Sequence, residues 1–274
     1  MRRLLVLTLC LLTACGSDDE VTRGEGGTLQ LGGNEARQVT ERSFRLDGRA
    51  LVFDLDNGTV TVVGTDVDEA ELRIERVARG SSSSTAAKRL DRMSVEEVGD
   101  SEIYQVVLRG DDGEGEFNVE ARVPLATALN IDVENGTVRL SGTTGEISAQ
   151  SENGSVEAAG LAGLRVELGT RRGNVAAGFA ALPAEADVRL ETENGNVTVT
   201  LPATADATVE AETETGTIAV DGLTFANRDL DRDGAGQAFR GRLGRGTADV
   251  RATTDLGTIR LEAGTPRTLV ALAT

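Results

Sequence analysis

Acidic residues recur at one fixed place in this sequence, two positions before a glycine. Six glycines in similar sequence contexts have such a neighbour, and the acidic residues are Asp56, Glu134, Glu152, Glu193, Glu214 and Asp255. Carboxylates gathered on one face of a fold can bind divalent cations or basic partners, and a pair at a suitable separation can hydrolyse a glycosidic bond. The interpretation that we favour is a hydrated acidic face that keeps β-sheets from associating.

A second acidic group, Asp229, Asp231 and Asp233 followed by Gly234, matches the first half of a calcium-binding loop of the EF-hand type. The twelfth position of such a loop carries a bidentate glutamate, whereas this sequence has Arg240 there. The pattern therefore favours an acidic surface loop, with weak calcium binding as the alternative. We predict no dedicated metal site and no cofactor.

Side chains that usually supply bases and nucleophiles are scarce. The chain has no histidine, its two cysteines are Cys10 and Cys15, and Lys88 is its single lysine. The formal net charge of −17 disfavours binding to nucleic acid. We therefore predict a protein that is not an enzyme. A carbohydrate-active β-helix enzyme that uses carboxylates alone is a minor alternative.

The first residues resemble a bacterial lipoprotein signal peptide. Arg2 and Arg3 precede an apolar run, and small residues lead to Cys15. The resemblance implies a signal peptide over residues 1–14 and lipid attachment at Cys15, with an ordinary secretory signal as the alternative. Gly16 follows the cysteine, where enteric lipoproteins held in the inner membrane carry Asp. The sequence therefore favours an anchor in the outer membrane.

The acidic positions belong to a repeat that must hold them in place. Aligning the chain on one glycine per copy gives seven copies, at Gly58, Gly136, Gly154, Gly173, Gly195, Gly216 and Gly257. Aliphatic or small residues alternate with polar ones on both sides of each glycine, which is the period of a half-buried strand. Asn precedes four of the glycines, and Asn-Gly is typical of a tight turn between strands. Each copy therefore predicts strand, turn and strand over about 20 residues.

Two architectures accommodate such copies, an antiparallel meander and a stack in which each copy pairs with the next in parallel. Aromatic residues make up only 3% of the chain, which suits the narrow interior of a stack. We predict an all-β fold with a parallel β-solenoid, or β-helix-like, stack. In such a stack Arg171, which replaces the acidic residue in one copy, lies between Glu152 and Glu193 and can bridge both.

The chain divides into three parts on composition. After the signal peptide, residues 15–40 are rich in glycine and charge and predict a flexible tether. Residues 41–274 predict a single β-repeat domain, with its regular copies at about 126–223 and a charged loop at 224–246. That loop contains a basic cluster of Arg240, Arg242 and Arg245, which could meet an acidic partner or the acidic face of a neighbouring molecule.

Three segments carry a resemblance to a known family: "SFRLDGRALVFDLDNGTVTVVG", "FNVEARVPLATALNIDVENGTVRLSG" and "FRGRLGRGTADVRATTDLGTIRLEAG". With the copies between them they resemble the putative-adhesin family of β-strand repeat proteins, the DUF4097 type. The resemblance implies an extracytoplasmic, solenoid-like domain, often anchored to an envelope, and brings no catalytic residues. We therefore predict a lipid-anchored envelope module, adhesin-like or scaffolding, that binds a protein or a polysaccharide. A regulatory envelope-stress lipoprotein acting through a protein partner is the alternative.

Overall fold

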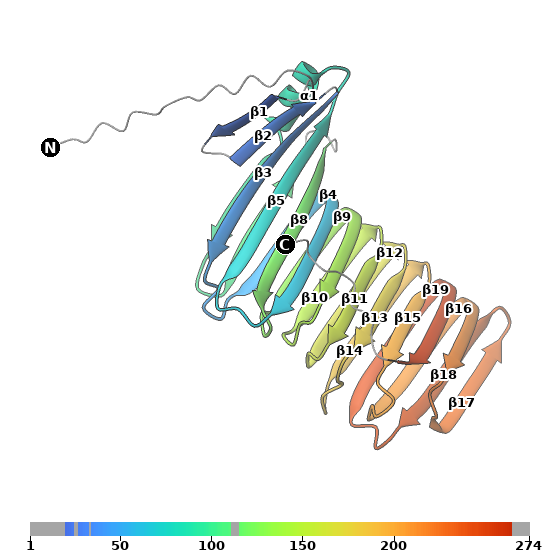
Figure 1. Ribbon diagram of the computed structural model, residues 1–274. Helices are drawn as coiled ribbons and strands as arrows, with labels where there is room; N and C mark the ends of the chain where they lie inside the picture. The colour runs from blue at the N-terminus through green and yellow to red at the C-terminus, as the bar shows by residue number, and fades with distance from the viewer. Residues whose placement is uncertain (1–19, 25–26, 33, 111–114, 265–274) are drawn as a thin grey trace.

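Strands dominate the computed structural model of this chain, which describes residues 20–24, 27–32, 34–110 and 115–264 (Figure 1). The described part contains 19 strands in one continuous sheet and one helix, so the all-β prediction is confirmed. The N-terminal elements are β1 (Glu20–Gly24), β2 (Gly27–Gly32), β3 (Glu35–Phe44), β4 (Ala50–Thr65), β5 (Ala70–Arg79), α1 (Ser83–Leu90), β6 (Ser94–Gly99), β7 (Ile103–Arg109) and β8 (Glu116–Pro124). The remaining strands are β9 (Leu129–Ser141), β10 (Ile147–Asn153), β11 (Val156–Leu161), β12 (Arg165–Arg172), β13 (Val175–Phe179), β14 (Asp187–Asn194), β15 (Val197–Leu201), β16 (Ala207–Asp221), β17 (Ala226–Asp233), β18 (Gly236–Leu243) and β19 (Ala248–Ala263).

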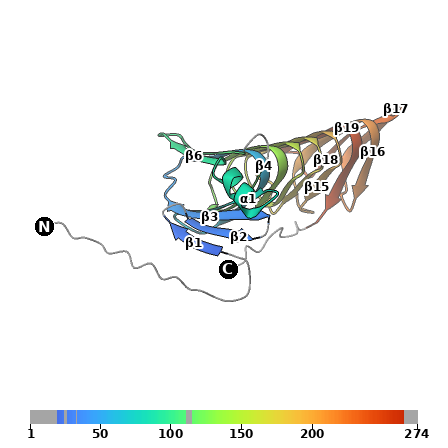
Figure 2. The ribbon, with the colours of Figure 1, turned by 90° about the horizontal axis from the view of Figure 1, so that it is seen from above.

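The sheet bends along the line of the seven glycines into two layers that enclose the core (Figure 2). The first layer contains β10, β12, β14 and the halves of β4, β9, β16 and β19 that precede the glycine. The second layer contains β11, β13, β15 and the halves that follow it. We call each pair of strands, or each bent strand, a unit. Inward positions alternate with outward ones, so Ile131 and Val138 of the same unit are fully buried.

Neighbouring units pair in parallel and in register. On β4 and β9, Asn57, Gly58 and Thr59 lie opposite Asn135, Gly136 and Thr137. The same parallel pairing joins β10 to β12 and β11 to β13. The prediction of parallel strands is therefore confirmed, and the antiparallel meander is wrong for these units.

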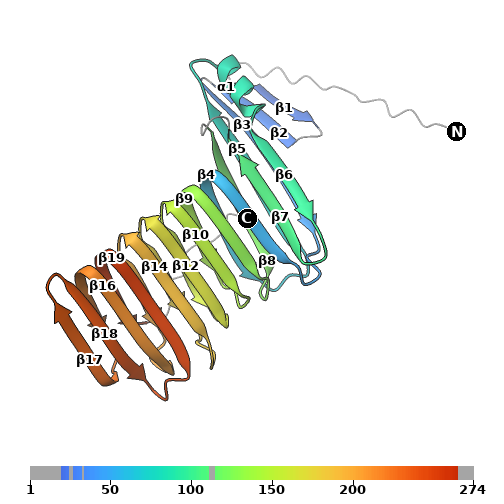
Figure 3. The same ribbon diagram turned by 180° about the vertical axis from the view of Figure 1, so that it is seen from behind.

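The units do not follow one another in chain order (Figure 3). β19, the last strand of the described chain, lies between β14 with β15 on one side and β16 on the other. At the opposite end, β4 lies between β7 with β8 and β9. Insertion gives the first and the last bent strand a hydrogen-bonded partner on both sides, so neither is an edge of the stack.

Glycine is required at the bend because neighbouring backbones approach closely there. A Cβ atom added to Gly136 would overlap the carbonyl oxygen of Gly58, and one added to Gly173 would overlap that of Gly154. The seven glycines have φ between 143° and 159°. Several bends lie inside a continuous strand, so the predicted tight turn is wrong: the chain passes from one layer to the other instead of folding back on itself.

Asparagine has another role at the bend than the one predicted. The only described residues other than glycine with positive φ are Asp47, Glu185 and Asn227, so the asparagines that precede the glycines do not supply positive φ. Their side chains instead join units, as where Asn153 Nδ2 donates to Asn135 Oδ1 at 3.0 Å. Just after the glycine, Asn174 Oδ1 accepts the Asn196 backbone N–H at 2.9 Å.

Buried hydroxyl groups hold the inner side of the bend. The residue three before the glycine donates its hydroxyl to the glycine carbonyl of the neighbouring unit in five copies. The bonds are Ser151 to Gly136 (3.1 Å), Thr170 to Gly154 (2.8 Å), Thr192 to Gly173 (3.0 Å), Thr254 to Gly195 (3.0 Å) and Thr213 to Gly257 (3.1 Å). The five hydroxyl residues are buried, and each bond removes the cost of burying a hydroxyl without a partner.

Two predicted segments differ in the structure. The sequence predicts a flexible tether over 15–40, whereas β1, β2 and β3 are strands, β3 pairs with β5 along its whole length and Ala36 is fully buried. The charged loop was placed at 224–246, but β17 and β18 form an antiparallel hairpin there that pairs with the first half of β16. Both segments are charged because they lie near the ends of the sheet, where charged strands block further pairing.

Aromatic pairs lie near the two ends of the stack. Phe44 stacks on Tyr104 with ring centroids 4.1 Å apart, and Phe225 meets Phe239 edge to face at 5.0 Å. The helix α1 is capped by Ser82, whose Oγ accepts the Thr85 N–H, and it packs against β3 and β5. Among the described residues no helix is long and apolar enough to cross a bilayer.

Candidate functional site

The predicted acidic residues lie in one row on the outer face of the first layer. In-register pairing places each of them beside the equivalent residue of the next unit, about 4.8 Å away. In space the row runs Asp56, Glu134, Glu152, Arg171, Glu193, Asp255 and Glu214, because β19 precedes β16 in the stack. We call this the carboxylate row.

Arg171 interrupts the carboxylate row and bridges its neighbours. Its Nη1 lies 3.4 Å from Glu152 Oε2 and its Nε lies 3.8 Å from Glu193 Oε1. The predicted bridge is confirmed. All three side chains are about half exposed, so the bridge relieves repulsion between the carboxylates more than it adds stability of its own.

Arg109 ends the row at the N-terminal side. Its Nη1 donates to Asp54 Oδ1 at 2.8 Å and lies 3.4 Å from Asp56 Oδ1, while the Gly110 N–H donates to Asp56 Oδ2 at 2.8 Å. The hydrogen bond to Asp54 is the main cause that raises the pKa of Arg109. Sequence reasoning missed this residue because β7 joins β4 only through pairing over more than 50 residues of chain.

Two residues further from the bend, four of the seven copies carry a carboxylate on the same face: Asp54, Asp132, Glu191 and Glu212. There burial, together with the nearby charges of Asp54 and Glu152, raises the pKa of Asp132 above its usual value. At the other end of the face, Glu191, Glu212, Glu214 and Asp255 are exposed. None of these four carboxylates has an ion pair within the described part of the chain.

The predicted basic cluster is dispersed in the structure. Arg240 Nη2 lies 3.1 Å from Glu210 Oε1, and Arg245 Nη2 lies 3.1 Å from Asp206 Oδ2. Arg251 also bonds Glu210, at 2.7 Å, and its hydrogen bond is the main cause that lowers the pKa of Glu210. Two of the three predicted arginines therefore neutralise carboxylates of their own molecule: Arg240 from β18, which pairs with β16, and Arg245 from the connection that follows β18.

The segment from Asp229 to Asp233 is a strand and does not form the loop that a calcium site of the EF-hand type needs. It belongs to β17, where Asp229 lies opposite Arg240 and Asp231 opposite Ala238. Within the described ranges no group of three or more His, Cys, Asp or Glu side chains is arranged to hold a metal ion.

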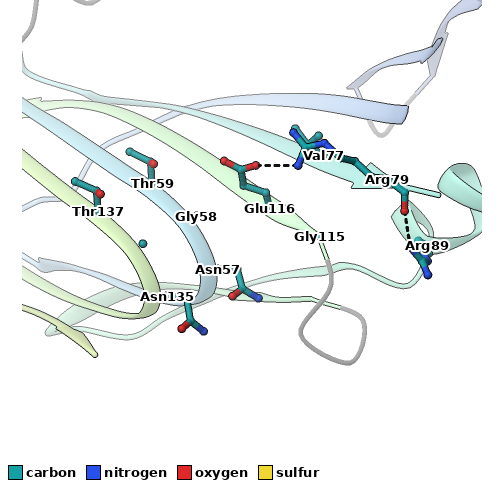
Figure 4. Close-up of a pocket in the computed structure, with 11 residues that line it drawn as sticks. Asn57, Gly58, Thr59, Val77, Arg79, Arg89, Gly115, Glu116, Asn135 and Thr137 are labelled. Atoms are coloured by element: carbon teal, nitrogen blue, oxygen red, sulfur yellow. Dashed lines mark hydrogen bonds and ion pairs between the residues drawn. The ribbon is translucent and has the colours of Figure 1, made fainter. Parts of the chain in front are cut away.

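A cavity of about 520 Å³ opens beside the bend at its N-terminal end (Figure 4). It is lined by polar residues of β4 and β9 on one side and by Arg79, Glu116 and Arg89 on the other. Arg79 Nη1 lies 3.6 Å from Glu116 Oε2, and Arg89 Nη1 donates to the Arg79 carbonyl oxygen at 2.6 Å. The cavity is lined by positively charged, negatively charged and neutral polar side chains. Its lining residues include no His, Cys, Ser or Lys.

The structure describes all the predicted site residues except Cys15. The seven glycines lie at equivalent bends, with the carboxylate row beside them on the outer face. Cys15, the predicted lipid attachment, lies outside the described residues. The exposed, carboxylate-bearing face is hollowed between the units: an open cavity of about 380 Å³ there is lined by Asp132, Glu152, Arg171, Glu191 and Glu193 among others.

A family description fits this arrangement of bent, parallel units. The family model described as Toastrack DUF4097 matches residues 25–262. The chain belongs to the Toastrack DUF4097 family. The match includes β3 and the hairpin of β17 and β18, which lie where the sequence predicts a tether and a charged loop. No curated protein matches the chain.

Solved structures similar to this Toastrack chain come from bacteria. A putative cell adhesion protein from Clostridium sporogenes is 11% identical, with 83% of this chain and 100% of that chain covered and a TM-score of 0.45. A putative adhesin from Bacteroides fragilis is 11% identical, covers 82% and 97% of the two chains, and has a TM-score of 0.29. A putative adhesin from Parabacteroides distasonis is 10% identical, with 83% and 97% covered and a TM-score of 0.23.

Proposed function

We propose that the chain is a non-catalytic binding module of the cell envelope, built as a parallel β-solenoid and working as an adhesin or a scaffold. The observation that carries the proposal is the outer face of the first layer, where carboxylates repeat in register and the group of Glu191, Glu212, Glu214 and Asp255 has no ion pair among described residues. Such a face attracts a partner with cationic groups and fixes its register by charge.

The chemistry of this face favours a protein over a polysaccharide as the partner. Sugar-binding surfaces commonly offer exposed aromatic rings on which the sugar rings stack. The exposed large apolar residues in the described part of the chain are Val98, Leu125, Leu164 and Leu256, and none of them is aromatic. A regulatory envelope lipoprotein would use the same surface, so the identity of the captured partner distinguishes it from a scaffold.

An enzyme is less well supported by the same surface. Asp132 is the described carboxyl group with a clearly raised pKa, as a general acid requires. It lines an open cavity on an exposed sheet face, however, and Asp132 is the only carboxyl group among the described residues of that cavity whose pKa is clearly raised.

The proposed binding face is tested with charge variants of the full chain on envelope fractions. Replacing Glu191, Glu214 and Asp255 by the corresponding amides should abolish capture of the partner, and added salt should weaken capture by the unaltered chain. A control variant replaces Glu120, Glu157 and Glu262 on the other layer with glutamine and keeps the same net charge. Equal loss in both variants would show that general charge, and not this face, governs binding.

We also propose that Cys15 carries the lipid and that the domain is held at the outer membrane. The signal-like sequence before Cys15 supports this proposal, and only a short stretch separates Cys15 from β1. Detergent phase partitioning and palmitate labelling of the chain test it against Cys15→Ser. Labelling of both forms would refute attachment at this residue.

Weak calcium binding is tested by thermal unfolding with calcium and with a chelator at fixed ionic strength. The strand conformation of the segment from Asp229 to Asp233 leads us to expect no shift beyond that of a matched monovalent salt. A calcium-specific rise in Tm that Asp229→Asn and Asp231→Asn abolish would restore the calcium site.

A further inference from the structure

The two layers of the stack end at different places on the C-terminal side. β18 pairs with residues 207–213 in the first half of β16, and β17 pairs with β18, so the first layer continues for two strands past β16 (Figure 3). The second half of β16 pairs with β19 over residues 215–221, and no described strand pairs with its other side. The second layer therefore ends at β16 in a free edge, which we define as residues 216–220.

Within the described residues, only part of the free edge has hydrogen-bond partners. The Gly216 N–H donates to the Ala235 carbonyl oxygen at 2.9 Å, and the Ile218 N–H donates to Gln237 Oε1 at 2.8 Å. Because every second residue of a strand presents its backbone groups on the same side, Val220 is the next residue there. Its N–H and carbonyl oxygen have no partner among the described residues. Gln237 thus fills with a side chain the place that the backbone of another strand would take.

The two layers differ in how their last strands resist further pairing. β17, the last strand of the first layer, reads ANRDLDRD and has a register shift between Ala226 and Asp229. Charged side chains and such irregularities block the addition of a strand. The free edge of the second layer reads GTIAV, with no charged residue, and β-branched residues such as these favour a paired strand.

Apolar side chains lie below the position that an added strand would take. On the inner side of the first layer, Leu230 of β17 lies opposite Phe239 of β18, and Phe225 meets Phe239 edge to face at 5.0 Å. Leu230 and Phe225 pack against the core but are only partly buried. Apolar residues at the inward positions of an added strand would cover these two side chains and gain from the burial.

An arginine beside the free edge favours an acidic residue in the added strand. Arg260 of β19 lies beside Ala219, each of them three residues after the bend glycine. Arg260 is exposed, and it has no ion pair among the residues that the structure describes. At the same position of two other neighbouring units, Arg139 pairs with Glu157 at 3.5 Å. A carboxylate on a strand added next to Ala219 would lie two strand spacings from Arg260, about 10 Å between backbones, which the two side chains can span.

We propose that the free edge of β16 binds an extended segment of a protein partner as one further parallel strand of the second layer. The segment would have apolar residues at its inward positions and a glutamate or aspartate opposite Ala219, so that backbone pairing gives affinity and these side chains give specificity. A second copy of the chain is a poorer donor, because its strands with this pattern, such as β11, are already paired on both sides. The proposal goes beyond the carboxylate row, which lies on the other layer.

The labelled peptide GSVEAAG tests the free edge of the full chain by fluorescence anisotropy. Its sequence is that of residues 154–160, which provide a second-layer strand with Glu157 at the required position. GSVEAAG should bind about fivefold more tightly than GSVRAAG, in which arginine replaces the glutamate. Arg260→Glu should reverse this preference. Equal binding of both peptides, or binding of neither at millimolar concentration, would overturn the proposal.

Val220→Pro blocks the free edge without removing a hydrogen bond that the described residues make. Proline is tolerated at the edge of a sheet where its missing N–H would face away from the neighbouring strand. The variant should keep the circular dichroism spectrum of the unaltered chain and lose binding of GSVEAAG. Gln237→Ala, which frees the Ile218 N–H, should strengthen binding severalfold. Unchanged binding in both variants would overturn pairing at this edge.

Two further measurements separate this edge from other binding modes. Amides at Glu191, Glu214 and Asp255 should leave peptide binding unchanged, so the proposed carboxylate face and this edge can fail independently. Sedimentation of the unaltered chain should show no dimer that Val220→Pro abolishes. Such a dimer would overturn the proposal by identifying a second copy as the occupant of the edge.

Discussion

The bend is built differently in the first two bent strands and in the units that follow. In β4 and β9 the inner residue three before the glycine is aliphatic, Leu55 and Val133, whereas the five later units use serine or threonine. At the next inner position, five residues before the glycine, the early units have the large residues Phe53 and Ile131, whereas several later units have alanine. One backbone path thus accepts two inner chemistries. A hydroxyl can be buried there because the glycine carbonyl of the neighbouring unit lies within reach as an acceptor.

Replacing a bend glycine should cause the largest loss of stability, both in the first two bent strands and in the later units. Gly58→Ala and Gly173→Ala each introduce a Cβ atom that overlaps a backbone carbonyl oxygen of the next unit. Urea unfolding should show a loss of about 3 kcal/mol or more for either variant. Gly48→Ala is the control, because Gly48 has positive φ but no atom within 4 Å of an added Cβ, and it should lose about 1–2 kcal/mol. Equal losses at Gly48 and Gly173 would show that φ strain, and not close approach, sets the requirement.

Removing an inner hydroxyl should destabilise only the later units. Thr192 is buried, and Thr192→Val leaves the Gly173 carbonyl without its side-chain donor, which should cost about 1–3 kcal/mol in the free energy of unfolding. Thr192→Ser should keep most of the stability. Thr198→Val, at an outward position of β15, should change it by less than about 0.5 kcal/mol.

The converse change, Val133→Thr, adds a hydroxyl in the aliphatic region near the Gly58 carbonyl. If the two inner chemistries are interchangeable, it should cost less than Thr192→Val in the same urea assay. A larger cost would mean that the early units exclude the hydroxyl by packing.

The arginines on the carboxylate row should contribute less to the free energy of unfolding than the bend glycines and the inner hydroxyls do. Arg109→Gln in the early region and Arg171→Gln in the later one each leave two carboxylates without their cation. We expect losses of about 0.5–1 kcal/mol at low salt, larger for Arg109 because it donates well-formed hydrogen bonds to Asp54. Both losses should shrink in 0.5 M salt. Salt-independent losses would indicate a packing role for the side chains instead.

The smallest effects concern titration, and they should have opposite signs in the two regions. The raised pKa of Asp132 means that its ionised form is disfavoured in the folded state, so Asp132→Asn should raise Tm slightly at pH 7. That gain should disappear as the pH falls through the pKa of folded Asp132. The lowered pKa of Glu210 means that Glu210→Gln should lower Tm at pH 7. This loss should vanish at acid pH, where Glu210 is protonated in the unaltered protein too. Tm profiles of both variants from pH 3 to pH 8 check the signs.

Local pattern was enough to predict the strands, their parallel pairing and the bridge at Arg171. These features repeat within about 20 residues, so neighbouring copies contain the same information. The order of the units was not predictable, because the position of β19 depends on pairing with β14, about 60 residues away in sequence. The hairpin of β17 and β18 was missed because its strands are charged, and sequence reasoning associates charge with loops. Likewise Arg109 meets Asp54 only through tertiary pairing.

The insertion of β19 between β14 and β16 imposes an order on folding. Until the last strand has been made, β16 has no unit to join, and the strands of β14 and β15 present an open edge. The stack therefore cannot be completed progressively from the N-terminus, and its longest-range pairing forms late, which predicts slow folding for the size of the domain. A chain interrupted before residue 248 would expose two edges capable of aggregation. Completion of the chain thus serves as a condition for a soluble fold.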